Sequence, residues 1–256
     1  MKELHVFYAP DIDVIQELSP EEAVHCGRVL RMKAGDEIHL TDGKGAVYRA
    51  DIMDMTGKRC VYQVKEKIEV PRQWDGHLHL AVAPTKNIDR MEWLAEKATE
   101  IGFDELSFIR CQYSERIVLK ADRIDKILVA AMKQSHKAEK PILNELTNFR
   151  EFVSQPFEGQ KFIAHCYDEA DILGKPKEGR QELGAQETDS KPFLGDVLER
   201  GKEALVMIGP EGDFSIDEVR LAMAKGFRPI SLGRSRLRTE TAALVAVHLM
   251  HLANRI

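Results

Sequence analysis

The chain has 256 residues, of which 43% are hydrophobic and 31% are charged, and its formal net charge is −5. This length is sufficient to bury the core of one large domain or of two smaller ones. The mild acidity excludes a domain that is basic throughout, as in a general polyanion binder, but it allows a local basic patch. The four cysteines form no C-x-x-C pair, and no apolar run is long enough to cross a bilayer. Without a recognisable signal peptide, these features predict a cytoplasmic protein with reduced thiols.

Short β-like segments separated by turn residues fill the first seventy residues. Hydrophobic residues recur along "GDEIHLTDGKGAVYRADIMDMTGKRCVYQVKEKIEV", and the Asp-Gly step at 42–43 is a strong hairpin signal. One helix interrupts this pattern, because Ser19 supplies an N-cap, Pro20 suits the first helical position and Glu22 completes a capping box. Residues 1–70 are therefore predicted to form a small β-barrel-like domain with one short helix.

Strands and longer helices alternate after a boundary at Pro71-Arg72-Gln73. This alternation predicts a mainly parallel sheet with helices on its faces, over residues 71–256. The expected strands lie at 77–84, 105–111, 160–167, 203–209 and 227–233, and the expected helices at 87–102, 121–135, 215–226 and from about 239 to the end. The stretch 172–196 is polar and rich in glycine and charge, which predicts a mobile surface insertion.

The stretch "VMIGPEGDFSIDEV" (206–219) is the strongest candidate for a binding loop. A buried strand ends here in Gly-Pro-Glu-Gly, and ligands of open parallel sheets bind at the carboxyl ends of the strands. Gly209 and Gly212 allow a ligand to approach the backbone closely, and Pro210 stiffens the turn. A tight connection without a ligand would have a similar pattern, but Glu211 between two glycines has no evident packing purpose.

The stretch "SLGRSRLRTETAALVAVHLM" (231–250) places a cationic loop directly before an apolar helix. Thr239 or Thr241 is expected to cap the helix, and Glu240 lies near its positive end. The helix is apolar nearly all round, so we expect it to be buried and to hold the loop in a fixed geometry. A solvated surface turn is the alternative interpretation of the three arginines in this loop, Arg234, Arg236 and Arg238.

Several common catalytic patterns are missing from the sequence. It contains no phosphate-binding P-loop, no dinucleotide fingerprint after the first strand of the second domain, and no G-x-S-x-G nucleophile elbow. His77 and His79 alternate on a strand, and His248 and His251 share a helix face, but neither pair has an evident third ligand. We therefore predict no metal site.

Two clusters of basic residues are candidates for contact with a nucleic-acid backbone. The first combines a helix edge with a hairpin: Arg28, Arg31 and Lys33 with Lys44 and Arg49. The second surrounds "RCQYSERIVLKADR", where Tyr113 is available for stacking on a base: Arg110, Arg116, Lys120 and Arg123. A solvated face explains the first cluster about as well.

Taken together, these motifs identify a family. The segments "HCGRVLRMKAGDEIHLTDGKGAVYRADI", "RMEWLAEKATEIGFDEL", "QYSERIVLK", "IGPEGDFSIDEV" and "LGRSRLRTETAA" resemble, in this order, the bacterial 16S rRNA (uracil-N3)-methyltransferases of the SPOUT superfamily. The resemblance covers nearly the whole chain. It departs from the family pattern at 134–137, where this chain has Gln-Ser-His-Lys and the family often has Gln-Ser-Gly-Arg, and the 172–196 stretch has no counterpart in the pattern.

The resemblance implies a PUA-like β-barrel that binds RNA, followed by an α/β SPOUT methyltransferase domain with a trefoil knot, in a homodimer. Composition and periodicity alone would not suggest a knot, since knots are almost absent from proteins. By resemblance, S-adenosylmethionine binds to three loops: Ala164, His165, Ile208, Gly209, Pro210, Glu211, Gly212, Leu232, Gly233, Leu237, Arg238, Thr239, Thr241 and Ala242. The RNA would contact Arg28, Arg31, Lys33, Arg110, Arg116, Arg234 and Arg236.

The implied reaction transfers a methyl group to N3 of a uridine in the small-subunit rRNA. Because this nitrogen carries a proton at neutral pH, either the proton must be removed or the anion must be stabilised. Arg238 stays protonated and suits a phosphate or the uracil oxygens, whereas Glu211 or Glu240 could orient the base or accept its proton. Three alternatives remain open: a ribose 2′-O-methyltransferase of the same superfamily, a non-catalytic RNA-binding assembly factor, and a metabolic nucleotide enzyme.

Overall fold

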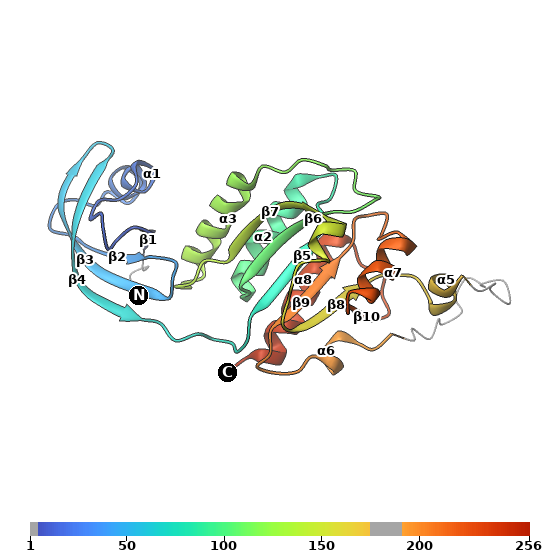
Figure 1. Ribbon diagram of the computed structural model, residues 1–256. Helices are drawn as coiled ribbons and strands as arrows, with labels where there is room; N and C mark the ends of the chain where they lie inside the picture. The colour runs from blue at the N-terminus through green and yellow to red at the C-terminus, as the bar shows by residue number, and fades with distance from the viewer. Residues whose placement is uncertain (1–4, 175–190) are drawn as a thin grey trace. The chain divides into compact units, whose positions relative to one another are not determined.

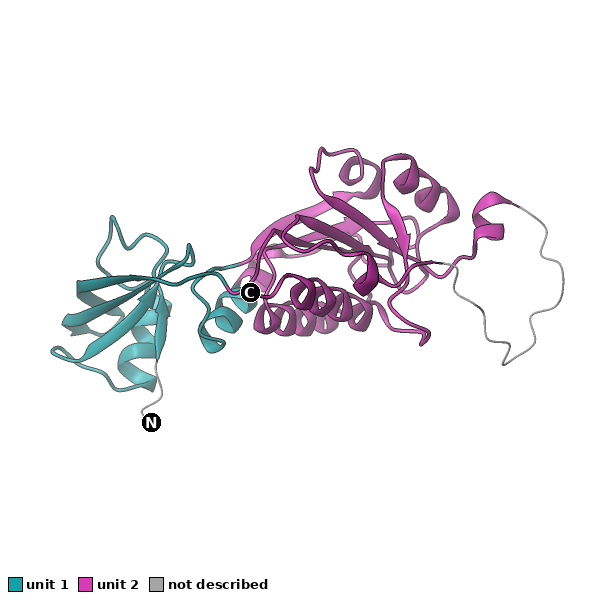
Figure 2. Cartoon of the chain, turned by 90° about the horizontal axis from the view of Figure 1, so that it is seen from below, with its two compact units in different colours: residues 1–72, 126–140 teal, residues 73–125, 141–256 magenta. Residues whose placement is uncertain are grey.

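The computed structural model describes residues 5–174 and 191–256, which form two compact units (Figure 2). Unit 1 consists of Met1–Arg72 and Lys126–Lys140, and unit 2 consists of Gln73–Asp125 and Pro141–Ile256. Most of the insertion expected at 172–196 lies outside the described residues. Its two ends are ordered, because helix α5 (Glu169–Leu173) precedes the gap and helix α6 (Leu194–Val197) follows it.

The described part of unit 1 contains a four-stranded sheet in the order β1-β2-β3-β4 (Figure 1). The strands are β1 (Val6–Tyr8), β2 (Glu37–Thr41), β3 (Ala46–Thr56) and β4 (Arg59–Glu69). β1 is parallel to β2, and the other pairs are antiparallel hairpins. The turn expected at Asp42-Gly43 is confirmed, and a second turn lies at Gly57; the two glycines have φ angles of 73° and 61°, which favour glycine.

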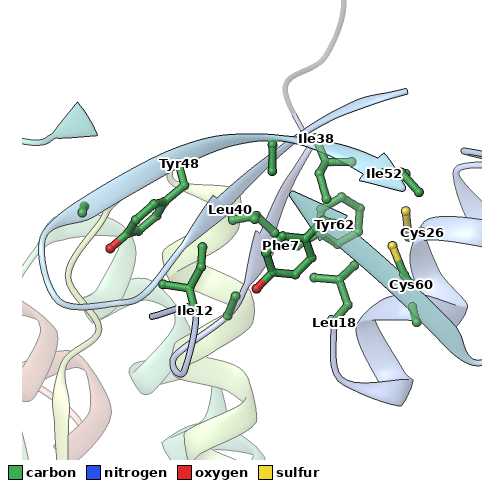
Figure 3. Packing of buried hydrophobic residues seen from close by; sticks show 14 residues of the cluster. Phe7, Ile12, Leu18, Cys26, Ile38, Leu40, Tyr48, Ile52, Cys60 and Tyr62 are labelled. Atoms are coloured by element: carbon green, nitrogen blue, oxygen red, sulfur yellow. The ribbon is translucent and has the colours of Figure 1, made fainter. Parts of the chain in front are cut away.

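The sheet of unit 1 bends around its core. Pairing between β3 and β4 shifts register twice, and such bulges increase the twist of a sheet. The segment after β1 bonds to β4, with Leu18 N donating to Cys60 O at 2.9 Å and Tyr62 N donating to Gln16 O at 3.1 Å. Figure 3 shows the enclosed core, in which Phe7, Leu40 and Tyr62 are almost fully buried.

The expected helix of unit 1 is present as α1 (Pro20–Val24). Ser19 Oγ accepts from Glu22 N at 3.3 Å, as a capping residue does, while the Glu22 carboxylate pairs with Lys133. The helix continues into a π-helical turn, His25–Val29.

Residues 126–140 are part of unit 1, although the sequence places them among the elements of the second domain. Helix α3 (Ala121–Gln134) leads into a short segment that bonds to the β2–β3 turn. Gly45 N donates to Ala138 O at 3.0 Å, and Lys140 N donates to Gly43 O at 2.9 Å. The turn glycines thus provide backbone partners for this segment.

The described part of unit 2 contains a parallel sheet in the order β10-β8-β9-β5-β6-β7. The strands are β5 (Leu78–Val82), β6 (Glu105–Arg110), β7 (Ile142–Asn148), β8 (Gln160–Ala164), β9 (Ala204–Ile208) and β10 (Arg228–Ile230). All five predicted strands are present. The sequence analysis missed β7, an edge strand whose polar residues obscure its pattern.

Helices cover both faces of this sheet (Figure 1). Helix α8 (Thr239–Asn254) packs on β5, β9 and α2 (Ile88–Ile101), while α4 (Phe149–Phe152) contacts β6, β7 and α7 (Ile216–Ala224). The expectation that α8 is buried on all sides is wrong for this chain, since His248 and Leu252 on its outer face are exposed. In the described part of the chain, no helix is long and apolar enough to span a membrane.

Candidate functional site

Four strand ends line up at one edge of the unit 2 sheet. Ile230 of β10 pairs with Ala164 of β8, Ala164 pairs with Ile208 of β9, and Ile208 pairs with Val82 of β5. The loops that follow these strands therefore begin side by side. This arrangement brings together the "IGPEG" loop, the loop after Ala164 and the cationic loop, which are far apart in the sequence.

The loops after β8 and β9 are tied to each other by Asp213. This residue has a φ angle of 65°, which is uncommon outside glycine, and its carboxylate accepts from Cys166 N at 2.8 Å and from Phe214 N at 2.7 Å. Tyr167 Oη also donates to Phe214 O at 2.7 Å. Buried surroundings and the Asp213 carboxylate raise the pKa of the Cys166 thiol, so this exposed cysteine is not an activated nucleophile.

The "IGPEG" loop is also tied to the loops after β5 and β6. Glu211 Oε1 accepts from Lys86 N at 2.9 Å. Arg116 donates from Nε to Thr85 O at 3.1 Å and from Nη2 to Lys86 O at 2.6 Å. A Cβ atom on Gly212 would lie 3.1 Å from Tyr113 Cβ, so the chain packs tightly at this glycine. Glu211 and Arg116 thus both hold loops through backbone atoms.

The segment that begins at Lys191 joins the loops after β8 and β10. Lys191 Nζ donates to His165 O at 2.6 Å and to Tyr167 O at 3.0 Å. Ser231 N donates to Pro192 O, and Leu194 N donates to Ser231 O, each at 2.9 Å. The end of the expected insertion is therefore part of the site's framework.

The cationic loop differs from its neighbours because its arginines have no protein partner. The guanidinium groups of Arg234, Arg236 and Arg238 are exposed and make no hydrogen bond or ion pair with any described residue. Arg238 is the N-cap of α8 and makes no side-chain cap bond, so the prediction of a threonine cap is wrong. Thr239 is buried at the first helical position instead.

Glu240 is an unusual carboxylate in the first turn of α8. It is only 7% exposed, and its Oε1 lies 3.7 Å from Arg90 Nε. Its Oε2 is buried without a hydrogen-bond partner among the described residues. An unpaired buried oxygen is costly, so Glu240 Oε2 has an open position for a hydrogen-bond donor such as an ordered water or a ligand atom.

The candidate cofactor residues lie at the last positions of β8 and β9 (Ala164 and Ile208), on the three loops, or in the first turn of α8. Of the candidate RNA residues, Arg116 bonds to backbone carbonyls, whereas Arg110 is exposed at the end of β6. Arg28, Arg31 and Lys33 are exposed on unit 1, on the π-helical turn and the loop after it. Their proposed companions are engaged elsewhere, because Lys44 donates to Pro10 O and Arg49 pairs with Glu66.

Sequence analysis missed three framework residues of this site, Asp213, Tyr167 and Lys191. Asp213 had a possible signal, since it follows Gly-Pro-Glu-Gly directly and an aspartate tolerates the left-handed region. Tyr167 and Lys191 act through contacts between loops that are distant in sequence.

A second polar cluster lies on the strands β5, β6 and β7. His77 Nε2 bonds to Glu105 Oε2 at 2.8 Å, and His79 Nε2 bonds to Ser107 Oγ at 2.8 Å. The His77 bond lowers the pKa of Glu105 to about 2, while burial lowers the pKa of His79 to about 4. Among residues 5–174 and 191–256, no group of three or more His, Cys, Asp or Glu residues is arranged to hold a metal ion.

Comparisons with known proteins agree on one class. A family model described as an RNA methyltransferase domain matches residues 72–251, and one described as an RNA methyltransferase PUA domain matches residues 18–64. The chain is similar to a probable rRNA-methyltransferase from Porphyromonas gingivalis, with a TM-score of 0.85 and 40% identity over 98% of both chains.

Two further relatives are informative, one through its bound cofactor and one through its named RNA. A methyltransferase from Legionella pneumophila, solved in complex with the cofactor SAM, has a TM-score of 0.83 and 27% identity, covering 99% of this chain and 100% of its own. The ribosomal RNA small subunit methyltransferase E of Synechocystis is 27% identical over 92% of this chain and 72% of its own length.

Proposed function

The chain belongs to the RNA methyltransferase family, and we propose that it transfers a methyl group from S-adenosylmethionine to N3 of a uridine in the 16S rRNA of the small ribosomal subunit. The observation that carries this proposal is the register of Ile230, Ala164 and Ile208. This register places the loops after β10, β8 and β9, the three candidate cofactor loops, at one edge of the sheet. The names of the Legionella and Synechocystis relatives support the cofactor and the substrate.

The three loops suit S-adenosylmethionine, which supplies an electrophilic methyl group on a sulfonium centre. At Gly209 a Cβ would lie 3.1 Å from Phe214 N, so the loop is compact and excludes a side chain at this position. The buried and unpaired Glu240 Oε2 also fits a site completed by a polar ligand. The residues that would hold the cofactor are 164–165, 208–212, 232–233, 237–239 and 241–242.

Two charged residues are suited to the chemistry on the uridine. The Arg238 guanidinium bonds to no residue in the described part of the chain, so this cation can bind the uracil oxygens, where negative charge develops. Glu240 has an unpaired buried oxygen and can accept the N3 proton. Glu211 Oε1 accepts a hydrogen bond from Lys86 N, so we assign Glu211 to holding the loop rather than to accepting the proton.

We infer that unit 2 carries the trefoil knot and that unit 1 closes as a PUA-like barrel. Support for the knot comes from the C-terminal segment, which leaves edge strand β10 and returns as α8 to pack on the inner strands β5 and β9. Support for the barrel comes from residues 6–18, because β1 bonds to β2 while residues 16–18 bond to β4. We keep the domain boundary at residues 70 and 71, directly after β4 (Arg59–Glu69), with residues 126–140 packed in unit 1.

RNA binding is assigned to the unpaired cations of both units, Arg28, Arg31 and Lys33 on unit 1 and Arg234 and Arg236 on unit 2. A homodimer is proposed on the outer side of α2 and α8, where Trp93 and Leu252 are 44% and 40% exposed. We place the activity in the cytoplasm, where ribosomal subunits are assembled.

The direct test uses purified protein, labelled S-adenosylmethionine, and small subunits or 16S rRNA from cells that lack the gene. After the reaction the RNA is digested and the labelled nucleoside is identified. We expect 3-methyluridine from the RNA and no transfer to free uridine.

Each other result supports a different function. A 2′-O-methylated nucleoside would indicate attack on the ribose. Binding of RNA without binding of the cofactor in calorimetry would indicate a non-catalytic assembly factor. Methylation of free uridine would indicate a metabolic enzyme.

A further inference from the structure

A pocket of about 410 Å³ lies at the carboxyl ends of β6 and β7, beside the start of α7. This volume falls within the range of about 300–1,000 Å³ that is usual for small-molecule sites. None of the loop residues that we assign to the cofactor lines it. All residues of its wall belong to unit 2.

Two arginines with free guanidinium groups flank this pocket. Arg110 ends β6 and is paired in register with Asn148, which ends β7. Asn148 Oδ1 accepts from Arg150 N at 3.0 Å, so the backbone of Arg150 is fixed next to that strand end. Neither guanidinium bonds to any residue in the described part of the chain. The two cations are thus available to one anionic group.

The acidic residues of the wall do not neutralise these arginines. Glu218 Oε1 accepts from Gln112 N and Oε2 accepts from Ser215 N, each at 2.8 Å. Asp217 lies 3.4 Å from Arg220 Nη1. Because both carboxylates bond to other groups, the guanidinium N–H donors of Arg110 and Arg150 remain available for a phosphate.

The remaining wall provides surfaces for a nucleobase. Ile117 is 60% exposed, Phe149 is buried behind the wall, and the exposed Gln112 and Asn148 carry amide groups that can bond to base edges. Exposed apolar side chains continue beyond the pocket at Tyr113, which is 48% exposed, and at Val118, which is 69% exposed. Such a run fits several successive bases better than one free nucleotide.

The pocket wall is fixed to the proposed cofactor loop. Gly212 packs against Tyr113 Cβ, and Glu218, which follows the same loop, binds Gln112 N. We propose that the pocket binds a nucleotide of the RNA strand next to the target uridine, with its phosphate on Arg110 and Arg150 and its base against Ile117. This proposal rests on the proposed function, because it takes the target RNA as the ligand.

Wild-type methylation of the small-subunit RNA is measured first, since its absence would contradict the proposed function itself. The test then compares the wild type with an R110A/R150A variant on a short RNA that contains the target uridine. We expect at least a tenfold rise in Kd and KM for the RNA, with unchanged kcat at saturating RNA and unchanged Kd for S-adenosylmethionine. The slope of log K against log salt should fall by about 0.7, because one contact with a single-stranded phosphate is lost.

Arg228→Ala is the matched control. Arg228 is an exposed arginine on β10, the opposite edge strand, where it lies over the Phe162 ring. If R110A/R150A binds RNA as well as this control does, the proposal is wrong. Tighter binding of a free uridine or adenosine monophosphate than of the short RNA would also overturn the assignment to a strand.

Cross-linking tests the pocket in the wild-type protein and does not depend on the folding of a variant. RNA with 4-thiouridine at the positions on either side of the target is irradiated in the complex, and the linked peptide is sequenced. We expect linkage within residues 110–118. Linkage only to peptides outside the pocket wall would contradict the proposal.

Discussion

Two groups of loops at the same edge of the parallel sheet use their charged residues in opposite ways. In the loops after β5, β6 and β9, Arg116 and Glu211 bond to backbone atoms of Thr85 and Lys86. In the loop after β10, the three arginines bond to no described residue. Identical residue types therefore have a structural role in one group and remain available to a ligand in the other.

This difference shows that neither exposure nor sequence pattern reveals whether an arginine bonds to the protein or is available to a ligand. A hydrogen bond to a charged group contributes about 1.5–3 kcal/mol, so Arg116 is expected to stabilise its loops. An arginine without a protein partner contributes little to stability, yet the anchored start of α8 still fixes where it lies. Variants of the two groups should accordingly separate activity from stability.

The largest effect is expected for Arg238→Ala. Loss of a positioned donor at the developing charge typically lowers kcat by about 100- to 1,000-fold. The melting temperature should stay within about 1 °C of the wild type, because surface changes without partners have small effects on stability. Steady-state methylation and a thermal melt check both values. Activity within threefold of the wild type would remove Arg238 from the mechanism.

Glu240→Gln should lower kcat by about 100-fold if Glu240 accepts the N3 proton. The deficit should shrink as the pH rises, because the uridine then loses its N3 proton to solvent without the help of a base. Glu211→Gln is the matched control, since the amide oxygen can still accept from Lys86 N. A deficit that stays constant across the pH range would assign Glu240 to structure instead.

Arg116→Ala tests the opposite role, that of a residue acting through backbone atoms. It removes the donors to Thr85 O and Lys86 O, and we expect a loss of about 2–4 kcal/mol in the free energy of unfolding. The KM for S-adenosylmethionine should rise about tenfold, while kcat changes less. Arg116→Lys should recover only part of both losses, because lysine has no fork to reach two carbonyls. If Arg116→Ala weakened RNA binding and left the stability unchanged, Arg116 would be an RNA contact, as the sequence analysis predicted.

Much of the fold could be predicted because its elements have strong local signals. The hairpin at Asp42-Gly43 and the capping box of Ser215 and Glu218 depend on residues within a few positions of each other. Strand β7 was missed because its position at the sheet edge requires no apolar pattern. The grouping of residues 126–140 with unit 1 was missed because it depends on backbone bonds to a turn about a hundred residues earlier.

The sequence predicted which loops form the candidate site, but not which atoms its side chains contact. Glycines and arginines identified the loops after β9 and β10, whereas the role of Arg116 depends on which carbonyls its guanidinium reaches. The threonine cap of α8 was predicted wrongly because Thr239 lies one position inside the helix. The pocket beside Arg110 and Arg150 arises from the pairing of β6 with β7, a strand that the sequence did not indicate.

The polar cluster of His77, His79, Glu105 and Ser107 should affect stability rather than activity, because its side chains bond to each other. Burial lowers the pKa of His79 to about 4 from its ordinary value of 6.5, so the unfolded chain binds more protons between these values. Stability is therefore lost as the pH falls from 6.5 through 4, by about 3–4 kcal/mol at most. The bond to His77 lowers the pKa of Glu105 to about 2, and this adds a further loss below pH 4.5.

The same bond raises the pKa of His77, and this contribution is lost as the pH rises above that raised value. Thermal melts from pH 7 to pH 4 measure the acid side. His79→Gln should flatten the decline between pH 6.5 and 4 and leave kcat at pH 7 unchanged. An equally steep decline in this variant would show that other groups cause it.

The smallest effect is expected at His136, in the turn that ends helix α3. Helix α3 ends with Lys137 N donating to Met132 O at 3.0 Å and His136 N donating to Lys133 O at 3.2 Å, the pattern of a Schellman motif. His136 occupies its left-handed position with a φ angle of 54°, where the family pattern often has glycine.

His136→Gly should therefore stabilise the protein by up to about 1 kcal/mol, because the relief of left-handed strain outweighs the entropy that glycine loses on folding. Ser135→Gly is the control and should be destabilising, since Ser135 Oγ donates to Ala131 O at 2.7 Å and its φ angle is not positive. Urea unfolding of both variants measures whether each substitution raises or lowers the free energy of unfolding. Destabilisation by His136→Gly would mean that contacts of the histidine side chain outweigh the strain, so that the departure from the family pattern has a role of its own.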